Sequence, residues 1–167
     1  MRILGIDPGY ERLGIAVLEK ADRAASVKNY GVSKEAVIFS ECFKTSAKLE
    51  FSERLHLIGA EIHGVIGKYK PEVLAIETLF LNTNQKTVMH VAEVRGVVIY
   101  EAICAGLKIF EASPPQIKIA TTGYGRANKI QINKMVKILV KIDENIKSDD
   151  ELDAIAIALT AFAHLRF

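Results

Sequence analysis

The sequence predicts an α/β protein, and three observations lead to this class. Short apolar runs bounded by Gly and Pro occupy the first 43 residues and are typical of buried strands. From residue 52 onward, apolar residues recur at helical spacing, as in Leu55, Ile58 and Ile62. The 167 residues, half of them hydrophobic, suffice for one domain with a real core. We therefore expect residues 1–167 to form a single domain.

Five segments read as strands. They are Ile3–Ile6, Leu13–Leu18, Ala36–Phe43, Val73–Ile76 and Leu107–Phe110. The first three are joined by turn-rich segments, including a Gly-Val-Ser turn within residues 30–34, and this pattern favours an antiparallel meander.

Helices are predicted over residues 52–70, 88–105, a short stretch from Ser113, 128–142, and a final segment from Ser148. The helix over 88–105 is apolar on more than one face, which is typical of a central helix or of one that packs against a second subunit. Ser148 and Glu151 have capping-box spacing at the start of the last helix.

Solitary carboxylates end two of the predicted strands. Asp7 follows the first run and Glu77 follows the fourth, and a carboxylate at such a place needs a cation or water nearby. The alternative for Asp7 is a simple type II turn, with Pro8 second and Gly9 third.

Two further acids lie in the first turns of the last helix. Asp150 and Asp153 are three residues apart, so they are neighbours on the helix surface. Favourable interaction with the helix dipole explains Asp149 and Asp150 but explains Asp153 less well. Carboxylates from distant segments are the oxygen ligands that Mg²⁺ prefers, and two such ions support phosphodiester cleavage.

The charge distribution and the cysteines limit which functions and cellular locations fit the sequence. The formal net charge is only +2, but residues 108–147 hold eight Lys or Arg against three acids. A positive flank beside acidic candidates suits an enzyme that acts on a polyanion, although a solvated helix face is the ordinary explanation.

Cys42 and Cys104 have no metal-ligand spacing and are expected to be core residues in a reducing cytosol. No signal-like or membrane-spanning run is present, so we expect a cytoplasmic protein.

Four motifs resemble the RuvC family of Holliday-junction resolvases, within the RNase H-like nucleases, from end to end of the chain. They are GIDPG at 5–9, AIETLF at 75–80, VRG at 94–96 and DELDAIAIA at 150–158. The resemblance implies a mixed five-stranded sheet flanked by helices, with the first three strands antiparallel. It also implies a crossover junction endodeoxyribonuclease of recombination and repair, a homodimer that nicks two opposed strands of a four-way DNA junction. The implied partner is the RuvA–RuvB branch-migration machinery.

The resemblance also implies roles for eight residues. The four metal-binding acids match Asp7, Glu77, Asp150 and Asp153, where some members have His at the third position. They would hold two Mg²⁺ ions per site, for which Mn²⁺ could substitute. Phe80 matches an aromatic residue used against junction bases, Lys118 and Lys129 match lysines near the scissile phosphate, and Arg95 fits a DNA-backbone contact.

Three other functions fit parts of this sequence pattern. Another RNase H-like nuclease acting on RNA or an RNA–DNA hybrid would share the acids. A non-catalytic junction-binding protein has no reason to keep a negative cluster facing phosphate. An actin-like ATPase or sugar kinase shares the Gly-Ile-Asp opening, but this chain lacks the second phosphate loop and the length of that group.

Overall fold

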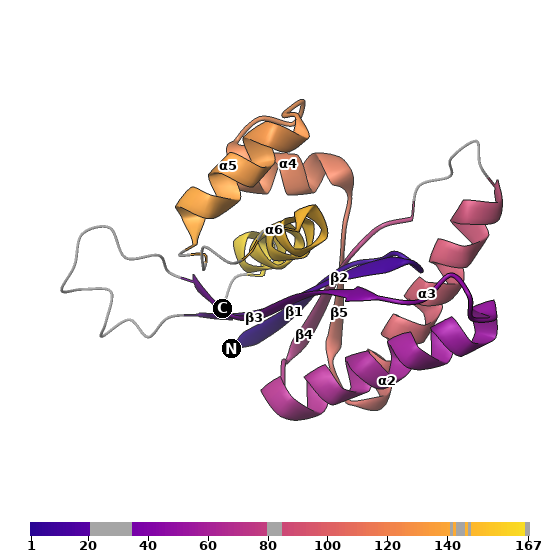
Figure 1. Cartoon of the computed structure of the whole chain (residues 1–167). Helices are drawn as coiled ribbons and strands as arrows, with labels where there is room; N and C mark the ends of the chain where they lie inside the picture. The colour runs from indigo at the N-terminus through magenta and orange to yellow at the C-terminus, as the bar shows by residue number, and fades with distance from the viewer. Residues whose placement is uncertain (21–34, 80–84, 141, 143–145, 147, 166–167) are drawn as a thin grey trace.

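A five-stranded sheet is the centre of the part of the chain that the computed structural model describes (Figure 1). The described residues are 1–20, 35–79, 85–140, 142, 146 and 148–165. The strands are β1 (Arg2–Asp7), β2 (Arg12–Lys20), β3 (Glu35–Lys44), β4 (Val73–Glu77) and β5 (Lys108–Ala112). Their order in space is β3-β2-β1-β4-β5, and β1–β2 and β2–β3 are antiparallel while β1–β4 and β4–β5 are parallel. The predicted mixed sheet, with its first three strands antiparallel, is confirmed.

Helices cover both faces of this sheet (Figure 1). On one face lie α2 (Phe51–Tyr69) and α3 (Gln85–Cys104). On the other lie α4 (Pro114–Thr122), α5 (Lys129–Leu139) and α6 (Asp149–His164). Each predicted helix is present, although α5 ends three residues before the predicted Ile142. No helix in the described part of the chain is long and apolar enough to cross a membrane.

The apolar side chains of the central strands point alternately to the two faces of the sheet, so the core has two layers. Ile3 of β1 packs into the cluster beneath α6, while Leu4 and Ile6 pack into the cluster beneath α2 and α3. In β4, Leu74 and Ile76 share the second cluster and Ala75 the first. Successive side chains of a strand point to opposite faces, so a sheet covered on both faces has a nearly continuous apolar sequence. This explains the unbroken runs that predicted these strands.

Two local predictions are wrong. A type II turn at Asp7 would need a positive φ at Gly9, but the positive-φ glycines among the described residues are Gly106 and Gly123. The cysteines are free but are not core residues, since Cys42 is half-buried and Cys104 is exposed. The Gly-Val-Ser turn predicted within 30–34 lies outside the described residues.

Candidate active site

Asp7 and Glu77 end two neighbouring parallel strands. β1 and β4 are in register with Ile6 opposite Ile76, so the two following carboxylates leave the sheet at the same edge. Both side chains are partly exposed, although the strands that carry them are buried. The strand positions predicted from sequence thus bring these two acids to one place.

Two glycines let α6 approach this edge closely. A Cβ built at Gly14 would lie 2.1 Å from the Asp150 carbonyl oxygen and 3.1 Å from the Asp7 Cβ. A Cβ built at Gly5 would lie 2.2 Å from the carbonyl oxygen of Ala154. Real Cβ atoms do not tolerate such distances, so only glycine lets the helix backbone lie directly on β1 and β2. The first turns of α6, with Asp150 and Asp153, are therefore beside Asp7.

Three of the four predicted acids line one small pocket. Asp7, Glu77 and Asp153 form its wall together with Lys118, in a cavity of about 160 Å³. The remaining wall is mainly apolar, made by Pro114, Ile117, Ile132 and Ile157. Carboxylates with little water around them repel one another strongly, so the pocket has a deficit of positive charge.

The pKa values of these three acids are raised, as expected where positive charge is lacking. Burial, and then repulsion from Asp153, Glu77 and Asp150, raises the pKa of Asp7 from 3.8 to about 7. Burial and the charge of Asp153 also raise the pKa of Glu77. Burial likewise raises the pKa of Asp153, despite an opposing ammonium from Lys129. A raised pKa of this kind is typical of a functional carboxylate cluster.

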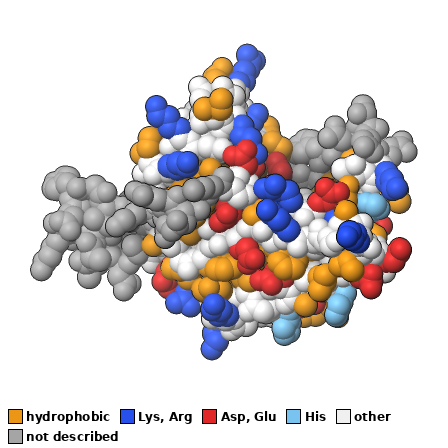
Figure 2. Space-filling view, in the orientation of Figure 1, with side chains coloured by type: hydrophobic (Ala, Val, Ile, Leu, Met, Phe, Trp, Pro, Cys, Tyr) orange, Lys and Arg blue, Asp and Glu red, His pale blue; other side chains and the backbone are white. Residues whose placement is uncertain are grey.

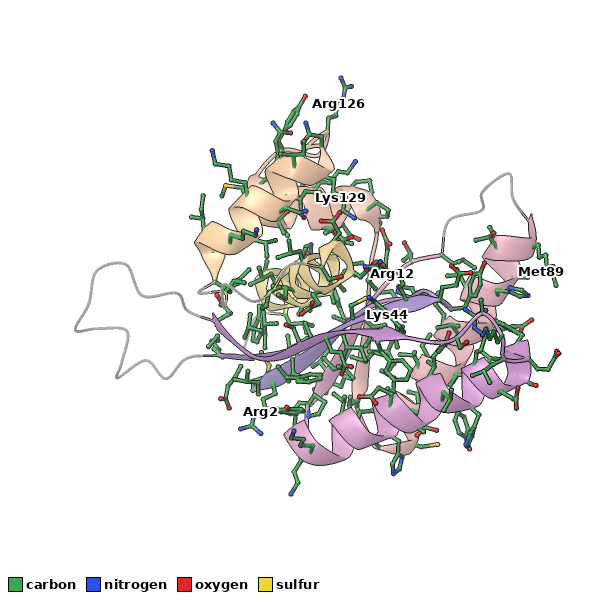
Figure 3. The ribbon with its side chains drawn as sticks, in the orientation of Figure 1. Arg2, Arg12, Lys44, Met89, Arg126 and Lys129 are labelled. Carbon is green, nitrogen blue, oxygen red and sulfur yellow. The ribbon has the colours of Figure 1, made fainter. Side chains whose placement is uncertain are left out.

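Lys129 supplies one positive charge to the cluster. It is the first residue of α5, and its Nζ lies 2.7 Å from Asp153 Oδ2 and 3.7 Å from Asp149 Oδ2. Burial opposes its charge, but the hydrogen bond to Asp153 and the nearby carboxylates outweigh this and raise the pKa of Lys129. Figure 3 shows Lys129 between α5 and α6, and Figure 2 shows Lys, Arg, Asp and Glu side chains intermingled across this face.

Asp150 has different surroundings from the other acids and does not line the pocket. Its Oδ2 accepts hydrogen bonds from Arg12 Nε (2.8 Å), Ser148 Oγ (3.0 Å) and Cys42 Sγ (3.3 Å). Burial alone would raise the pKa of Asp150, but these hydrogen bonds and the Arg12 charge outweigh it and lower the pKa.

The capping box predicted at the start of α6 is therefore wrong. Ser148 is the N-cap residue, but its side chain makes no capping hydrogen bond. Its hydroxyl donates to Asp150, and Glu151 accepts a hydrogen bond from Ser40 of β3 instead of reaching back to the cap. The Ser148 hydroxyl oxygen accepts a hydrogen bond from Arg12 Nη2 (3.3 Å) and not from the backbone of α6.

The donor set suits a hard divalent cation. In the described part of the chain, no three Asp, Glu, His or Cys side chains already stand as a group that could hold a metal. Asp7, Glu77 and Asp153 nevertheless line one pocket, and their mutual repulsion leaves it short of positive charge. Carboxylate oxygens are the ligands that Mg²⁺ and Mn²⁺ take, so the residues fit such an ion after side-chain rotation.

Arg95 has a buried role that the sequence did not reveal. Its side chain is 10% exposed, and it donates to the Glu77 carbonyl oxygen and, at 2.7 Å, to Glu111 Oε2 of β5. It thus links α3 to the ends of β4 and β5 and fixes the backbone that carries Glu77. The predicted DNA contact by Arg95 stays a prediction. Phe80, the predicted base-stacking residue, lies outside the described residues.

Sequence reasoning also missed Arg54, which fixes the turn after Asp7. Arg54 is 7% exposed and donates to the Tyr10 carbonyl oxygen (3.0 Å) and Thr45 Oγ1 (2.8 Å). Its guanidinium also lies 5.0 Å from the centre of the Tyr10 ring. The one sign of this role in the sequence was that Arg54, a charged residue, lies in the amphipathic helix segment. An arginine on the exposed face of that helix would give the same pattern.

Comparison with known proteins gives consistent matches over almost the whole chain. Residues 3–161 match the family model of the crossover junction endodeoxyribonuclease RuvC. A protein of that name from Caldanaerobacter subterraneus is 42% identical over 159 residues, 95% of this chain and 90% of the relative. One from Thermosipho melanesiensis is 38% identical over the full length of both chains. The structure of Thermus thermophilus RuvC in complex with a Holliday junction substrate aligns with a TM-score of 0.85 at 30% identity, covering 97% of this chain and 93% of that one.

Proposed function

Because the chain belongs to the RuvC family of crossover junction endodeoxyribonucleases, we propose that it resolves Holliday junctions by paired nicks in opposed strands. The observation that carries this function is the pocket at the ends of β1 and β4, where Asp7, Glu77 and Asp153 meet Lys118. The family, the RNase H-like fold and the nuclease activity predicted from the sequence motifs are confirmed by the matches. The family assignment sets aside the actin-like ATPase, while an RNA-directed nuclease stays an alternative to be tested.

The reaction is metal-dependent hydrolysis, and we assign two Mg²⁺ ions per site, for which Mn²⁺ can substitute. Asp7, Glu77, Asp150 and Asp153 would hold them. Such ions supply an activated water and stabilise the leaving oxygen of the phosphodiester. Support comes from the raised pKa of Asp7, since a carboxylate that is costly to ionise alone is stabilised by a cation.

Lysines from α4 and α5 border the acids. Lys118 lines the same pocket as the carboxylates, where its ammonium can bind a phosphate oxygen and hold the scissile bond near Asp7. Lys129 contacts Asp153 and reduces the repulsion that a DNA phosphate meets on approaching the cluster. Phe80 would stack on a base at the junction, as the family resemblance implies.

Paired nicks require two active sites, and we place the homodimer contact on α2 and α3. A groove of about 770 Å³ runs between these helices, lined by residues that include Gly59, His63, Val97, Tyr100 and Glu101. On α3, Met89, Tyr100 and Ile103 are 62%, 66% and 57% exposed. Large apolar side chains on an outer helix are typical of a surface that a partner covers.

Two further assignments rest on the family resemblance. We propose that the enzyme works with the RuvA–RuvB branch-migration machinery. We also place it in the cytoplasm, where a DNA substrate and the two free thiols are both expected.

The Asp7→Asn variant tests the catalytic assignment. It removes one charge from the cluster with little change in shape, so cleavage of a synthetic four-way junction should be lost while junction binding is retained. Binding is measured by gel shift with Ca²⁺ in place of Mg²⁺, and cleavage by denaturing gel. Loss of binding together with cleavage would make Asp7 a structural residue.

A further inference from the structure

Arg12 makes the shortest ion pair with any of the four acids. It is the first residue of β2, and its Nε and Nη2 lie 2.8 and 2.6 Å from Asp150 Oδ2. The Arg12 side chain is 51% exposed and that of Asp150 is 23% exposed. Figure 3 shows Arg12 between α6 and β2, close to Lys44.

One oxygen of Asp150 receives all of these hydrogen bonds. Besides the hydrogen bond from Arg12 Nε, Oδ2 accepts from Ser148 at the start of α6 and from Cys42 of β3. A carboxylate oxygen has about two lone-pair sites, so these donors fill its capacity as an acceptor. This oxygen cannot also coordinate a cation unless some of the donors leave.

Among these donors Arg12 is the one that carries charge, and it is also the one with room to move. Ser148 and Cys42 are short side chains on the elements that frame Asp150, and both are partly buried. Arg12 is long, half-exposed and attached at the rim of the sheet. A divalent cation that approaches Asp150 therefore meets a positive guanidinium already in place.

We propose that Arg12 is a positioning residue that acts as a built-in counter-ion of Asp150, and that a divalent metal ion must displace it to bind Asp150 Oδ2. The inference rests on the proposed function, because it takes Asp150 as a metal ligand. It assigns Arg12 two effects. Arg12 stabilises the acid cluster while no metal is bound, and it lowers the affinity of the finished site for the metal.

The direction of the effect follows from charge. Removing Arg12 takes a positive charge from the site, removes one of the three donors from Asp150 Oδ2 and leaves the other carboxylates in place, so metal affinity should rise. An ion pair with a half-exposed arginine is weakened by water, so the expected gain in affinity is only about two- to fivefold.

The test uses the full chain without DNA, with Mg²⁺ as the probe and the midpoint of thermal unfolding as the readout. Arg12→Gln should reach half of its Mg²⁺-induced stabilisation at an about two- to fivefold lower concentration than the parent. Arg12→Lys keeps the charge and should stay within twofold of the parent. Lys44→Gln is the matched control, because Lys44 lies opposite Arg12 in the β2–β3 register and no described ion pair joins it to Asp150. Its half-saturating concentration should equal that of the parent.

A second measurement observes the displacement itself. The Arg12 Nε–Hε resonance in a ¹H–¹⁵N spectrum, assigned by its loss in Arg12→Gln, should move toward the position of a free arginine as Mg²⁺ is added. A resonance that stays unchanged at saturating Mg²⁺, or an Arg12→Gln variant with unchanged or weaker Mg²⁺ affinity, would overturn the counter-ion role alone. A parent protein with no Mg²⁺-induced stabilisation at all would overturn the proposed metal site and this inference with it.

Discussion

Asp7 shows how a single carboxylate can be costly to the fold and useful to the reaction. Its pKa in the folded chain is about 7 against an ordinary 3.8, chiefly because it is buried and then because Asp153, Glu77 and Asp150 repel its charge. An acid whose pKa is raised on folding binds its proton more tightly in the folded state. The stability that this proton provides is complete below pH 4 and is lost as the pH rises through 7.

The stability of Asp7→Asn should therefore depend on pH in a defined way. At pH 8 without metal, the variant should be more stable than the parent by about 1–4 kcal/mol, because it lacks the buried charge. Near pH 4, where the parent carboxyl is protonated, the difference should disappear. Urea unfolding of both proteins at pH 4, 6 and 8, with a chelator present, measures this. A variant that is equally or less stable at pH 8 would contradict the proposed charge crowding.

The sequence pattern singled out the four acids, whose metal-binding role stays a prediction, but it gave no sign of their ion-pair partners. Asp7 and Glu77 stand out because each follows an apolar run, and Asp153 because a helix cap does not explain it. Arg12 and Asp150 are 138 residues apart, and nothing near either residue signals the other. Arg95 is similar, since a buried arginine that supports the Glu77 backbone looks in the sequence like a surface charge.

The helix α6 is the element that completes the site, and Gly14 sets its distance from the sheet. In Gly14→Ala the new Cβ would lie 2.1 Å from the Asp150 carbonyl oxygen, so the helix start must move away from Asp7. We expect a loss of about 1–3 kcal/mol in the free energy of unfolding and a severe loss of junction cleavage. Urea unfolding and a cleavage time course measure both effects.

Gly64→Ala is the matched control for that variant. Gly64 lies in the middle of α2, and a Cβ there meets nothing within 4 Å. Alanine favours a helix by about 1 kcal/mol over glycine, so this variant should be as stable as the parent or more stable, with normal cleavage. If Gly14→Ala behaved in the same way, close packing of α6 on β1 would not be what builds the site.

Strands and helices were predictable because each has a local pattern, whereas the side-chain bonds at their ends were not. The apolar runs of β1 and β4 and the stripe of α2 placed these elements within a few residues. The capping box at Ser148 fits the local spacing but does not form, because the Ser148 hydroxyl oxygen accepts from Arg12 and the Glu151 carboxylate accepts from Ser40. The pairing of β1 with β4, which brings Asp7 to Glu77, depends on long-range contacts and was not predicted from the sequence.

At the scale of the whole molecule, the proposed dimer is tested by the outer face of α3. Tyr100→Lys places a charge where an apolar side chain is 66% exposed beside the α2–α3 groove. We expect the variant to be a monomer by light scattering and to cut junction strands singly rather than in pairs. Ile138→Lys, on α5 and 65% exposed, is the control and should stay dimeric. A Tyr100→Lys dimer with paired cuts would show that the subunits meet elsewhere.

The most direct test of the proposed function is the choice of substrate. The purified protein is incubated with Mg²⁺ and a synthetic four-way junction, a linear duplex of the same sequence, or an RNA–DNA hybrid, and the products are mapped on a denaturing gel. We predict symmetric nicks in two opposed strands of the junction, with the duplex and the hybrid left intact. Cleavage of the hybrid with the junction untouched would keep the fold and the carboxylate site but would contradict junction resolution.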